Sequence, residues 1–246
     1  MSILIVGGTK GIGLAIAKAF APDAGDVFLG YRSDEAAAEH AAQAVTAAGG
    51  RPHLIKADVG TPEGAAILAE GVRAQCDRLD QVVHSAVDAY ATTTLDADPH
   101  RFAAAITTNG TSLLYIVQAT LPLMVRGSTV FYLTSRGGRI VVPNYAAVGG
   151  AKALAESLMR YLAVELAPKG IRINAIAPSI VETDAVRMLF GDKTSGLIRE
   201  AASHNPSGRG VTDRDYTNLM RWLASPEAEF VQGQVMFVNG GANLSA

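Results

Sequence analysis

The stretch "ILIVGGTKGIG" (residues 3–13) joins an apolar run to a glycine-rich turn, after which a helical pattern begins. Gly7 and Gly11 let the backbone turn tightly and approach a pyrophosphate, and Gly13 lets the following helix pack close to the strand. The N-terminus of that helix would face the anion. Glycines alone are common in turns, but a strand, glycines and a helix in this order predict a dinucleotide-binding unit.

The same alternation of short apolar runs and helical periodicity continues along the chain, which is typical of parallel strands joined by crossover helices. It predicts strands at Ile3–Val6, Val27–Tyr31, His53–Lys56, Gln81–His84, Thr129–Leu133, Arg172–Ile176 and Val235–Val238. It predicts helices at Ile12–Phe20, Glu35–Ala48, Pro62–Gln75, His100–Leu123, Asn144–Ala167 and Asp213–Ala224. We therefore expect a single α/β domain over residues 1–246, with a Rossmann-type, doubly wound, seven-stranded parallel sheet and helices on both faces.

No strand pattern is found between Thr183 and Gly210, where apolar Met188, Leu189 and Phe190 are mixed with glycine and proline. Long connections of this kind are often functional. A substrate lid is predicted at about residues 184–210, and a surface excursion is the alternative.

Composition excludes several classes of protein. The 246 residues are 49% hydrophobic and carry a net charge of −2 with both signs dispersed, so we expect a sizeable core and no nucleic-acid partner. The single cysteine, Cys76, excludes an intrachain disulfide and fits a reducing compartment. Without a secretory signal, a cytoplasmic location is expected. No metal is expected, because no zinc-ligand spacing is found and each histidine is expected at the surface or in a loop: His40, His53, His84, His100 and His204.

The stretch Phe102–Val125 carries no charged side chain and has the length of a membrane span, but its many polar residues argue against one. It is predicted to be a buried or subunit-interface helix. A second apolar face is predicted from Leu154, Leu158, Tyr161, Leu162 and Leu166. Together they would expose a large apolar patch on a monomer, so we expect a homo-oligomer.

The choice of dinucleotide is expected to depend on residues after the second strand, where NAD enzymes commonly place an acid for the ribose 2′-hydroxyl. Arg32 stands there, and Lys10 lies within the glycine turn. Two cations favour NADP(H), because each can pair with a 2′-phosphate. If Asp34 were the ribose ligand instead, NAD would be favoured.

Tyr145 and Lys152 are seven residues apart in "PNYAAVGGAK" (residues 143–152), so they project from one helix face about 10 Å apart along the axis. A nearby ammonium lowers the pKa of a phenol, and a phenol so tuned can donate a proton. Taken alone, the pair could equally be a helix-start tyrosine beside an exposed lysine.

Over essentially its whole length the chain resembles the short-chain dehydrogenase/reductase family. The matching features are the glycine turn, "ADV" (57–59), "VVHSA" (82–86), Asn109, "LTS" ending at Ser135, the Lys152 helix, "INAIAP" (173–178) with Thr183, and "NGG" (239–241). In most of the family the catalytic tyrosine stands four residues before the lysine, and Val148 occupies that position here.

A tyrosine seven residues before the lysine resembles the divergent enoyl-acyl carrier protein reductases, and Arg32 resembles their NADPH-using subgroup. In an enoyl thioester, hydride goes to Cβ, and negative charge develops on an oxygen bonded two carbons away. A displaced tyrosine is compatible with a displaced oxyanion.

The resemblance implies a role for each matching position. Tyr145 would hydrogen-bond the enolate oxygen, Lys152 would hold the nicotinamide ribose, and Ser135 and Asn109 would support them. The cofactor would lie against Gly7, Thr9, Lys10, Gly11, Ile12, Gly13, Arg32, Ser33, Asp58, Val59, Ser85, Ala86, Lys152, Pro178, Val181 and Thr183. The substrate would lie against Val148, Met188, Leu189 and Phe190.

The leading hypothesis is an NADPH-dependent reductase of an activated carbon–carbon double bond, with an acyl substrate on acyl carrier protein or coenzyme A, in fatty acid or polyketide-like metabolism. The alternatives are a carbonyl or 3-ketoacyl reductase of the same family and a catalytically silent dinucleotide-binding sensor. The family resemblance also implies a homotetramer or dimer.

Overall fold

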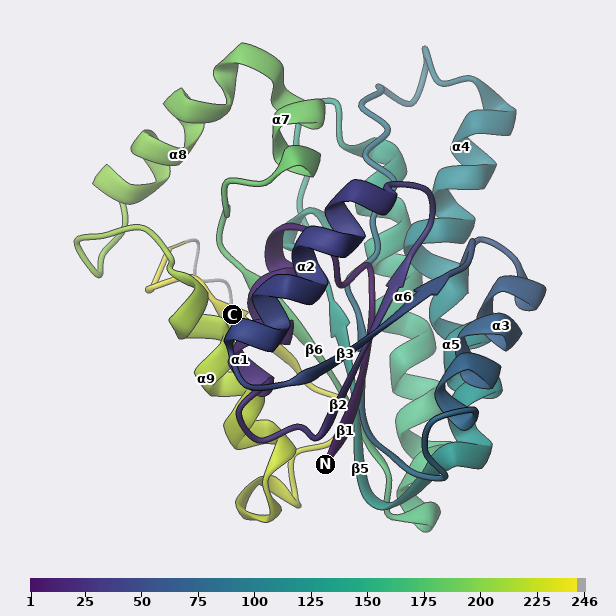
Figure 1. Ribbon diagram of the computed structural model, residues 1–246. Coiled ribbons are helices and arrows are strands. Elements are labelled where there is room, and N and C mark those ends of the chain that lie inside the picture. The colour runs from purple at the N-terminus through teal and green to yellow at the C-terminus, as the bar shows by residue number, and fades with distance from the viewer. Residues whose placement is uncertain (243–246) are drawn as a thin grey trace.

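The computed structural model describes residues 1–242, in which seven parallel strands form one sheet (Figure 1). The strands are β1 (Ser2–Val6), β2 (Asp26–Tyr31), β3 (Arg51–Lys56), β4 (Leu79–His84), β5 (Met124–Leu133), β6 (Arg172–Pro178) and β7 (Val235–Val238). Their order across the sheet is β3-β2-β1-β4-β5-β6-β7, so the winding reverses between β1 and β4. The predicted doubly wound parallel sheet is confirmed. In such sheets ligands bind at the carboxyl ends of the strands beside the reversal.

Helices cover both faces of the sheet. They are α1 (Gly11–Phe20), α2 (Glu35–Ala47), α3 (Pro62–Arg73), α4 (Pro99–Ile106), α5 (Ser112–Thr120), α6 (Ala146–Leu166), α7 (Asp184–Phe190), α8 (Thr194–Ser203) and α9 (Asp213–Ala224). The helices α1, α2 and α9 pack on one face, and α3, α5 and α6 pack on the other. The fold is therefore three layers, with a separate apolar core on each side of the sheet.

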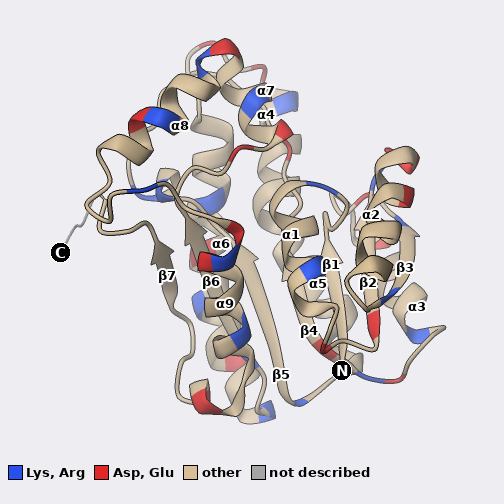
Figure 2. Cartoon of the chain, turned by 60° about the vertical axis from the view of Figure 1, so that its left-hand side comes forward, with Lys and Arg blue, Asp and Glu red and all other residues tan. Residues whose placement is uncertain are grey.

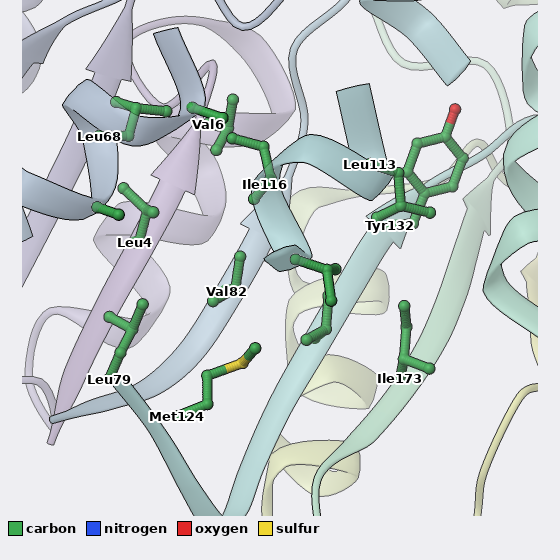
Figure 3. Packing of buried hydrophobic residues seen from close by; sticks show 14 of the residues in the cluster. Leu4, Val6, Leu68, Leu79, Val82, Leu113, Ile116, Met124, Tyr132 and Ile173 are labelled. Atoms are coloured by element: carbon green, nitrogen blue, oxygen red, sulfur yellow. The ribbon is translucent and has the colours of Figure 1, made fainter. Parts of the chain in front are cut away.

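Strand β1 contributes to both cores, which explains why it is apolar at every position. Ile3 and Ile5 pack under α1, whereas Leu4 and Val6 point to the opposite face. Figure 3 shows Leu4, Val6 and Val82 in this second core, facing Ile116 of α5. A strand buried on both faces reads as a continuous apolar run, because side chains alternate between the two faces.

The single helix predicted at His100–Leu123 is wrong, because the segment is divided. Helix α4 ends at Ile106, a π-helical turn (η1, Thr107–Thr111) follows, and α5 begins at Ser112. The π turn packs against α6. A Cβ on Gly110 would lie 2.9 Å from the carbonyl oxygen of Ala151, so glycine permits this close approach. The apolar periodicity runs through the interruption, and for that reason the sequence pattern did not reveal it.

The predicted apolar face of α6 is partly wrong. Leu162 and Leu166 are buried in the core against the sheet, and the exposed apolar side chains of this part of the helix are Tyr161 and Val164. With 3.6 residues per turn, residues 155, 159, 162 and 166 share the core-facing side. The homo-oligomer stays a prediction.

The segment after β6 contains two helices, α7 and α8, and no strand lies between them, as the sequence pattern predicted. Within the described part of the chain, no helix is long and apolar enough to cross a membrane. In Figure 2 the basic and acidic residues are interspersed over helices and loops and do not gather by sign.

Candidate active site at the carboxyl end of the sheet

The glycine turn lies between β1 and α1 and leaves almost no room for side chains. Gly7 and Gly11 have positive φ angles of 76° and 48°. A Cβ on Gly7 would lie 2.7 Å from the backbone of Ala86, and one on Gly13 would lie 2.1 Å from the carbonyl oxygen of Gly7. The turn therefore presents backbone at the N-terminus of α1, which is the environment that a pyrophosphate requires.

The cations expected to select the dinucleotide stand beside this turn. Lys10 lies at the N-cap position of α1 and donates a hydrogen bond to the Asp34 carboxylate. The other oxygen of Asp34 accepts a hydrogen bond from the Ala37 backbone N–H at 3.0 Å and so caps α2. Arg32 and Ser33 are exposed directly after β2. Asp34 is thus engaged by a lysine and a helix, and Arg32 forms no ion pair within the described residues.

The other predicted cofactor contacts follow the carboxyl ends of four strands. Thr9 is buried and Ile12 half-buried in the glycine turn and the first turn of α1. The remaining positions come after β3, after β4, at the end of β6 and in the loop leading to α7: Asp58, Val59, Ser85, Ala86, Pro178, Val181 and Thr183. The methyl group of Thr183 would lie 2.9 Å from a Cβ on Gly11, so the loop that leads to α7 touches the glycine turn. The fold brings these positions to one edge of the sheet.

Tyr145 is the N-cap residue of α6. Asn144 precedes it with a φ of 58°, a left-handed conformation that asparagine tolerates better than most residues. The Asn144 carbonyl accepts a hydrogen bond from the Thr92 N–H at 3.0 Å, which ties the turn to the loop after β4. The Tyr145 ring packs against Gly137 on one side and stacks on Phe190 of α7, with centroids 6.5 Å apart. The phenol is therefore fixed by three separate segments.

Burial raises the pKa of Tyr145, and a hydrogen bond with Ser135 opposes that rise. The expectation that Lys152 lowers the pKa of this phenol is wrong for the structure. The reason is that the lysine is engaged elsewhere. Its ammonium donates a hydrogen bond to the Leu133 carbonyl at 2.7 Å and lies 4.6 Å from the centroid of the Tyr132 ring. Tyr145 is therefore a protonated donor at neutral pH.

Lys152 is buried, and this rules out the alternative of an exposed surface lysine. Burial lowers the pKa of Lys152 to about 7, while the carboxylate of Glu156 acts in the opposite direction. The ammonium can therefore lose its charge within the physiological pH range.

Asn109 lies in the π turn and is fully buried. Its side chain donates to the Asp88 carbonyl at 2.9 Å and accepts from the Asp88 N–H at 2.7 Å. Its own carbonyl accepts a hydrogen bond from the Tyr132 hydroxyl. Asn109 therefore holds the loop after β4. It also fixes the hydroxyl of Tyr132, the ring of which lies beside Lys152.

His84 is a residue whose placement the sequence reading missed. It ends β4 with no exposed surface, so the expectation of a surface or loop residue is wrong. Its Nε2 lies 2.6 Å from the Ser112 hydroxyl, which donates to the Thr108 carbonyl at 2.7 Å. Since that hydroxyl proton is committed, Nε2–H is the donor to Ser112. Burial and the nearby Lys152 lower the pKa of His84 to about 3, so the ring is neutral. Its position in "VVHSA" was the available signal.

The four predicted substrate residues are placed differently. Val148 has no exposed surface, so it cannot contact a substrate in this structure. Leu189 is buried, and Met188 is 68% exposed. Phe190, which stacks on Tyr145, is the one in contact with the candidate catalytic group. The segment 184–190 thus closes one side of the tyrosine, as expected of a substrate-covering segment.

A family model described as Enoyl-(Acyl carrier protein) reductase matches residues 6–243. Among curated proteins, 1-cyclohexenylcarbonyl-CoA reductase of Streptomyces collinus is 30% identical over 99% of this chain and 87% of that protein. The 3-oxoacyl-[acyl-carrier-protein] reductase FabG of Staphylococcus epidermidis is 28% identical over 98% of this chain and 98% of its own length.

Two solved structures share the fold over nearly all their residues. The Enoyl-[acyl-carrier-protein] reductase (NADH) from Aquifex aeolicus VF5 matches with a TM-score of 0.89 and 28% identity, covering 100% of this chain and 97% of its own. The Pseudomonas aeruginosa RhlG/NADP active-site complex matches with a TM-score of 0.87 and 28% identity, covering 99% and 96%. The likeness therefore extends well beyond the glycine turn.

Proposed function

Because the chain belongs to the short-chain dehydrogenase/reductase family, whose members bind a nicotinamide dinucleotide, we propose that it is an NADPH-dependent reductase of an activated carbon–carbon double bond. The proposed substrate is an enoyl thioester on coenzyme A or acyl carrier protein. Fatty acid or polyketide-like metabolism is the corresponding pathway class.

The observation that carries the proposal is the position of the phenol. Tyr145 stands at the start of α6, seven residues before Lys152, and the position four residues before the lysine is a buried valine. A carbonyl reductase needs its acid beside the carbon that accepts hydride, whereas an enoyl reductase needs it beside an oxygen two carbons away. The shifted phenol suits the second arrangement. The Streptomyces collinus relative is named for such a substrate, in which a double bond is conjugated with a thioester carbonyl.

NADPH is the cofactor that the charges favour. Asp34, the residue that could have bound an unphosphorylated ribose, is occupied by Lys10 and by the N-terminus of α2. Arg32, which forms no ion pair within the described residues, is then the cation available for a 2′-phosphate, whereas Lys10 is paired with Asp34. The glycine turn supports the fit, since a Cβ on Gly7 or Gly13 would collide with backbone where the pyrophosphate is expected. The Aquifex aeolicus relative is named for NADH, so this preference requires a test.

The roles of the chain's own residues follow from their contacts. When bound, NADPH supplies the hydride. Tyr145, protonated and aligned by Ser135, donates a hydrogen bond to the thioester oxygen as negative charge develops there. Lys152 would hold the nicotinamide ribose, and Asn109 holds the loop after β4 through the Asp88 backbone. Phe190 stacks on the phenol ring and covers one of its faces.

The test follows NADPH oxidation at 340 nm with crotonyl-CoA and, in parallel, acetoacetyl-CoA, for the wild type and Tyr145→Phe. We expect crotonyl turnover, a loss of about a hundredfold or more in kcat for Tyr145→Phe, and little acetoacetyl turnover. Tyr161→Phe is the matched control, because Tyr161 is exposed on the same helix. Acetoacetyl turnover alone would contradict the proposal.

The second candidate is a 3-ketoacyl or other carbonyl reductase, which the FabG relative favours. In that case Tyr145 would serve a ketone oxygen, and the acetoacetyl arm of the same assay would respond. NADPH binding without turnover of either thioester would favour the silent sensor. The cytoplasmic location and the homotetramer or dimer stay predictions.

A further inference from the structure

Glu156 is a buried carboxylate on α6, one helical turn after Lys152, and the residue is 4% exposed. Oε1 accepts a hydrogen bond from the Thr134 hydroxyl at 2.7 Å, and Oε2 accepts one from Arg139 Nε at 2.9 Å. A buried carboxylate is costly unless it is paired and hydrogen-bonded. Glu156 meets this condition with two partners from a single short segment.

Those partners stand at the two ends of the segment 134–139, which links β5 to the turn before α6. Between them lie Ser135, whose side chain lowers the pKa of Tyr145, and Gly137, where a Cβ would lie 2.6 Å from the Tyr145 ring. A Cβ on Gly138 would lie 3.2 Å from Cβ of Lys152. The carboxylate therefore holds both ends of the segment 134–139, and this segment packs against the ring of Tyr145.

The same carboxylate is the acidic group beside Lys152. The titratable groups that act on or contact the lysine are His84 from β4, Tyr132 from β5 and Glu156 from its own helix. His84 is neutral, and burial raises the pKa of Tyr132, so neither supplies a negative charge. Glu156 raises the pKa of Lys152 against the effect of burial.

Arg139 links this arrangement to the edge of the sheet. Its guanidinium lies 5.0 Å from the centroid of the Phe237 ring on β7 while Nε holds Glu156. These contacts therefore join β5, α6 and β7, and the Glu156 charge is balanced by a half-exposed cation.

We infer that Glu156 is a positioning residue for the tyrosine–lysine pair: its carboxylate ties together both ends of the segment 134–139 and supplies the negative charge that favours the cationic form of Lys152. The inference rests on the proposed roles of Tyr145 and Lys152 in reduction. It predicts two separable effects, one on the charge of the lysine and one on the rate.

The first experiment titrates Lys152 by NMR between pH 5 and 9 in protein labelled with [ε-13C]lysine, with the resonance assigned from Lys152→Met. In Glu156→Gln we expect the pKa of Lys152 to fall by about one unit, because an adjacent opposite charge has been removed. The alkaline limb of NADPH affinity should move by the same amount. Glu165→Gln, an exposed residue on the same helix, should move neither. An unchanged pKa of Lys152 in folded Glu156→Gln would overturn the inference.

The second experiment uses Thr134→Val, which keeps the Glu156 carboxylate but removes its hydrogen bond from Thr134. This variant also tests the positioning role if Glu156→Gln does not fold. We expect kcat to fall by about tenfold with the pKa of Lys152 within a few tenths of wild type. A wild-type kcat in this variant would overturn the positioning role. The lysine titration needs neither substrate nor cofactor. A wild-type protein that reduces no thioester would therefore refute the proposed function, and the titration would still decide the charge effect.

Discussion

The candidate site has a nucleotide end, at the glycine turn, and a catalytic end, around Tyr145 and Lys152, and different kinds of groups form the two. At the nucleotide end, backbone does the positioning, and the side chains that carry charge are about half exposed, as in the Lys10–Asp34 pair. At the catalytic end, the charged and polar groups are buried: Lys152 is 5% exposed, Glu156 4% and His84 0%. We therefore expect the nucleotide end to be sensitive to side-chain volume and tolerant of changes in charge. The catalytic end should be sensitive to charge and pH.

The largest effect is expected from adding one methyl group at the nucleotide end. In Gly13→Ala the new Cβ would lie 2.1 Å from the Gly7 carbonyl oxygen, which cannot move without opening the turn. We expect a loss of about 3 kcal/mol in the free energy of unfolding and no measurable NADPH binding. Urea denaturation and cofactor fluorescence measure both. Gly196→Ala is the control, because its Cβ meets nothing within 4 Å inside α8 and should be neutral or stabilising. Equal effects of the two substitutions would show that the glycine turn is not especially sensitive to side-chain volume.

The next effect concerns acid stability at the catalytic end. The pKa of His84 is depressed to about 3 from 6.5, so the folded state binds fewer protons than the unfolded state between these values. Stability is therefore full above pH 6.5 and is lost as pH falls, by roughly 2 kcal/mol between pH 6.5 and 5. Urea unfolding at several pH values should show this slope in the wild type and lose it in His84→Gln. The exposed His100→Gln should retain it. A slope that survives in His84→Gln would show that another group titrates.

A smaller effect separates the two ends by pH. Lys152 loses its proton as pH rises through about 7, so in the free enzyme the affinity for NADPH should fall by up to tenfold per pH unit above that value. The nucleotide fragment 2′,5′-ADP reaches only the glycine turn and its neighbouring cations, so its affinity should change little between pH 7 and 9. Titration calorimetry with both ligands makes the comparison. Parallel losses for the two ligands would mean that the pH dependence does not come from Lys152.

The smallest effect is expected from the exposed cation. Arg32→Ala should weaken NADPH binding by about fivefold or less and leave NADH binding unchanged, because an exposed ion pair contributes about 1 kcal/mol or less. The exposed Arg199→Ala on α8 is the matched control. Equal losses for both dinucleotides would indicate that Arg32 does not meet the 2′-phosphate.

Local sequence signals predicted what depends on neighbours along the chain. Strand β7 and helix α9 have the predicted bounds. The order of strand, glycine turn and helix at residues 3–13 was also predicted correctly. At Gly7, Gly11 and Gly13 a Cβ would lie within 3 Å of an atom of another residue, so only glycine allows the segments to approach this closely. The nucleotide end was therefore the more predictable half.

The catalytic end depends on contacts between residues far apart in the chain, and these leave little mark on a sequence pattern. His84 and Ser112 are 28 residues apart, and Thr134 and Glu156 are 22 apart. From the sequence, a glutamate in a helix is expected on the exposed face. The structure shows instead that Glu156 is buried and hydrogen-bonded to Thr134 and Arg139. The direction of the pKa of Tyr145 was mispredicted for the same reason: burial, which the sequence does not report, raises it, and Lys152 is engaged by the Leu133 carbonyl instead.

The π turn at Thr107–Thr111 has a consequence for insertions and deletions. A π turn is an α-helix into which one extra residue has been inserted. Deleting one residue within this turn would restore ordinary helical hydrogen bonding and remove the widened turn from which Asn109 projects, while α4 and α5 would keep their relative rotation. Asn109 would then turn away from the Asp88 backbone that it holds with two hydrogen bonds. The number of residues between α4 and α5 therefore matters as much as their identity, and length variation should be confined to the loops on either side.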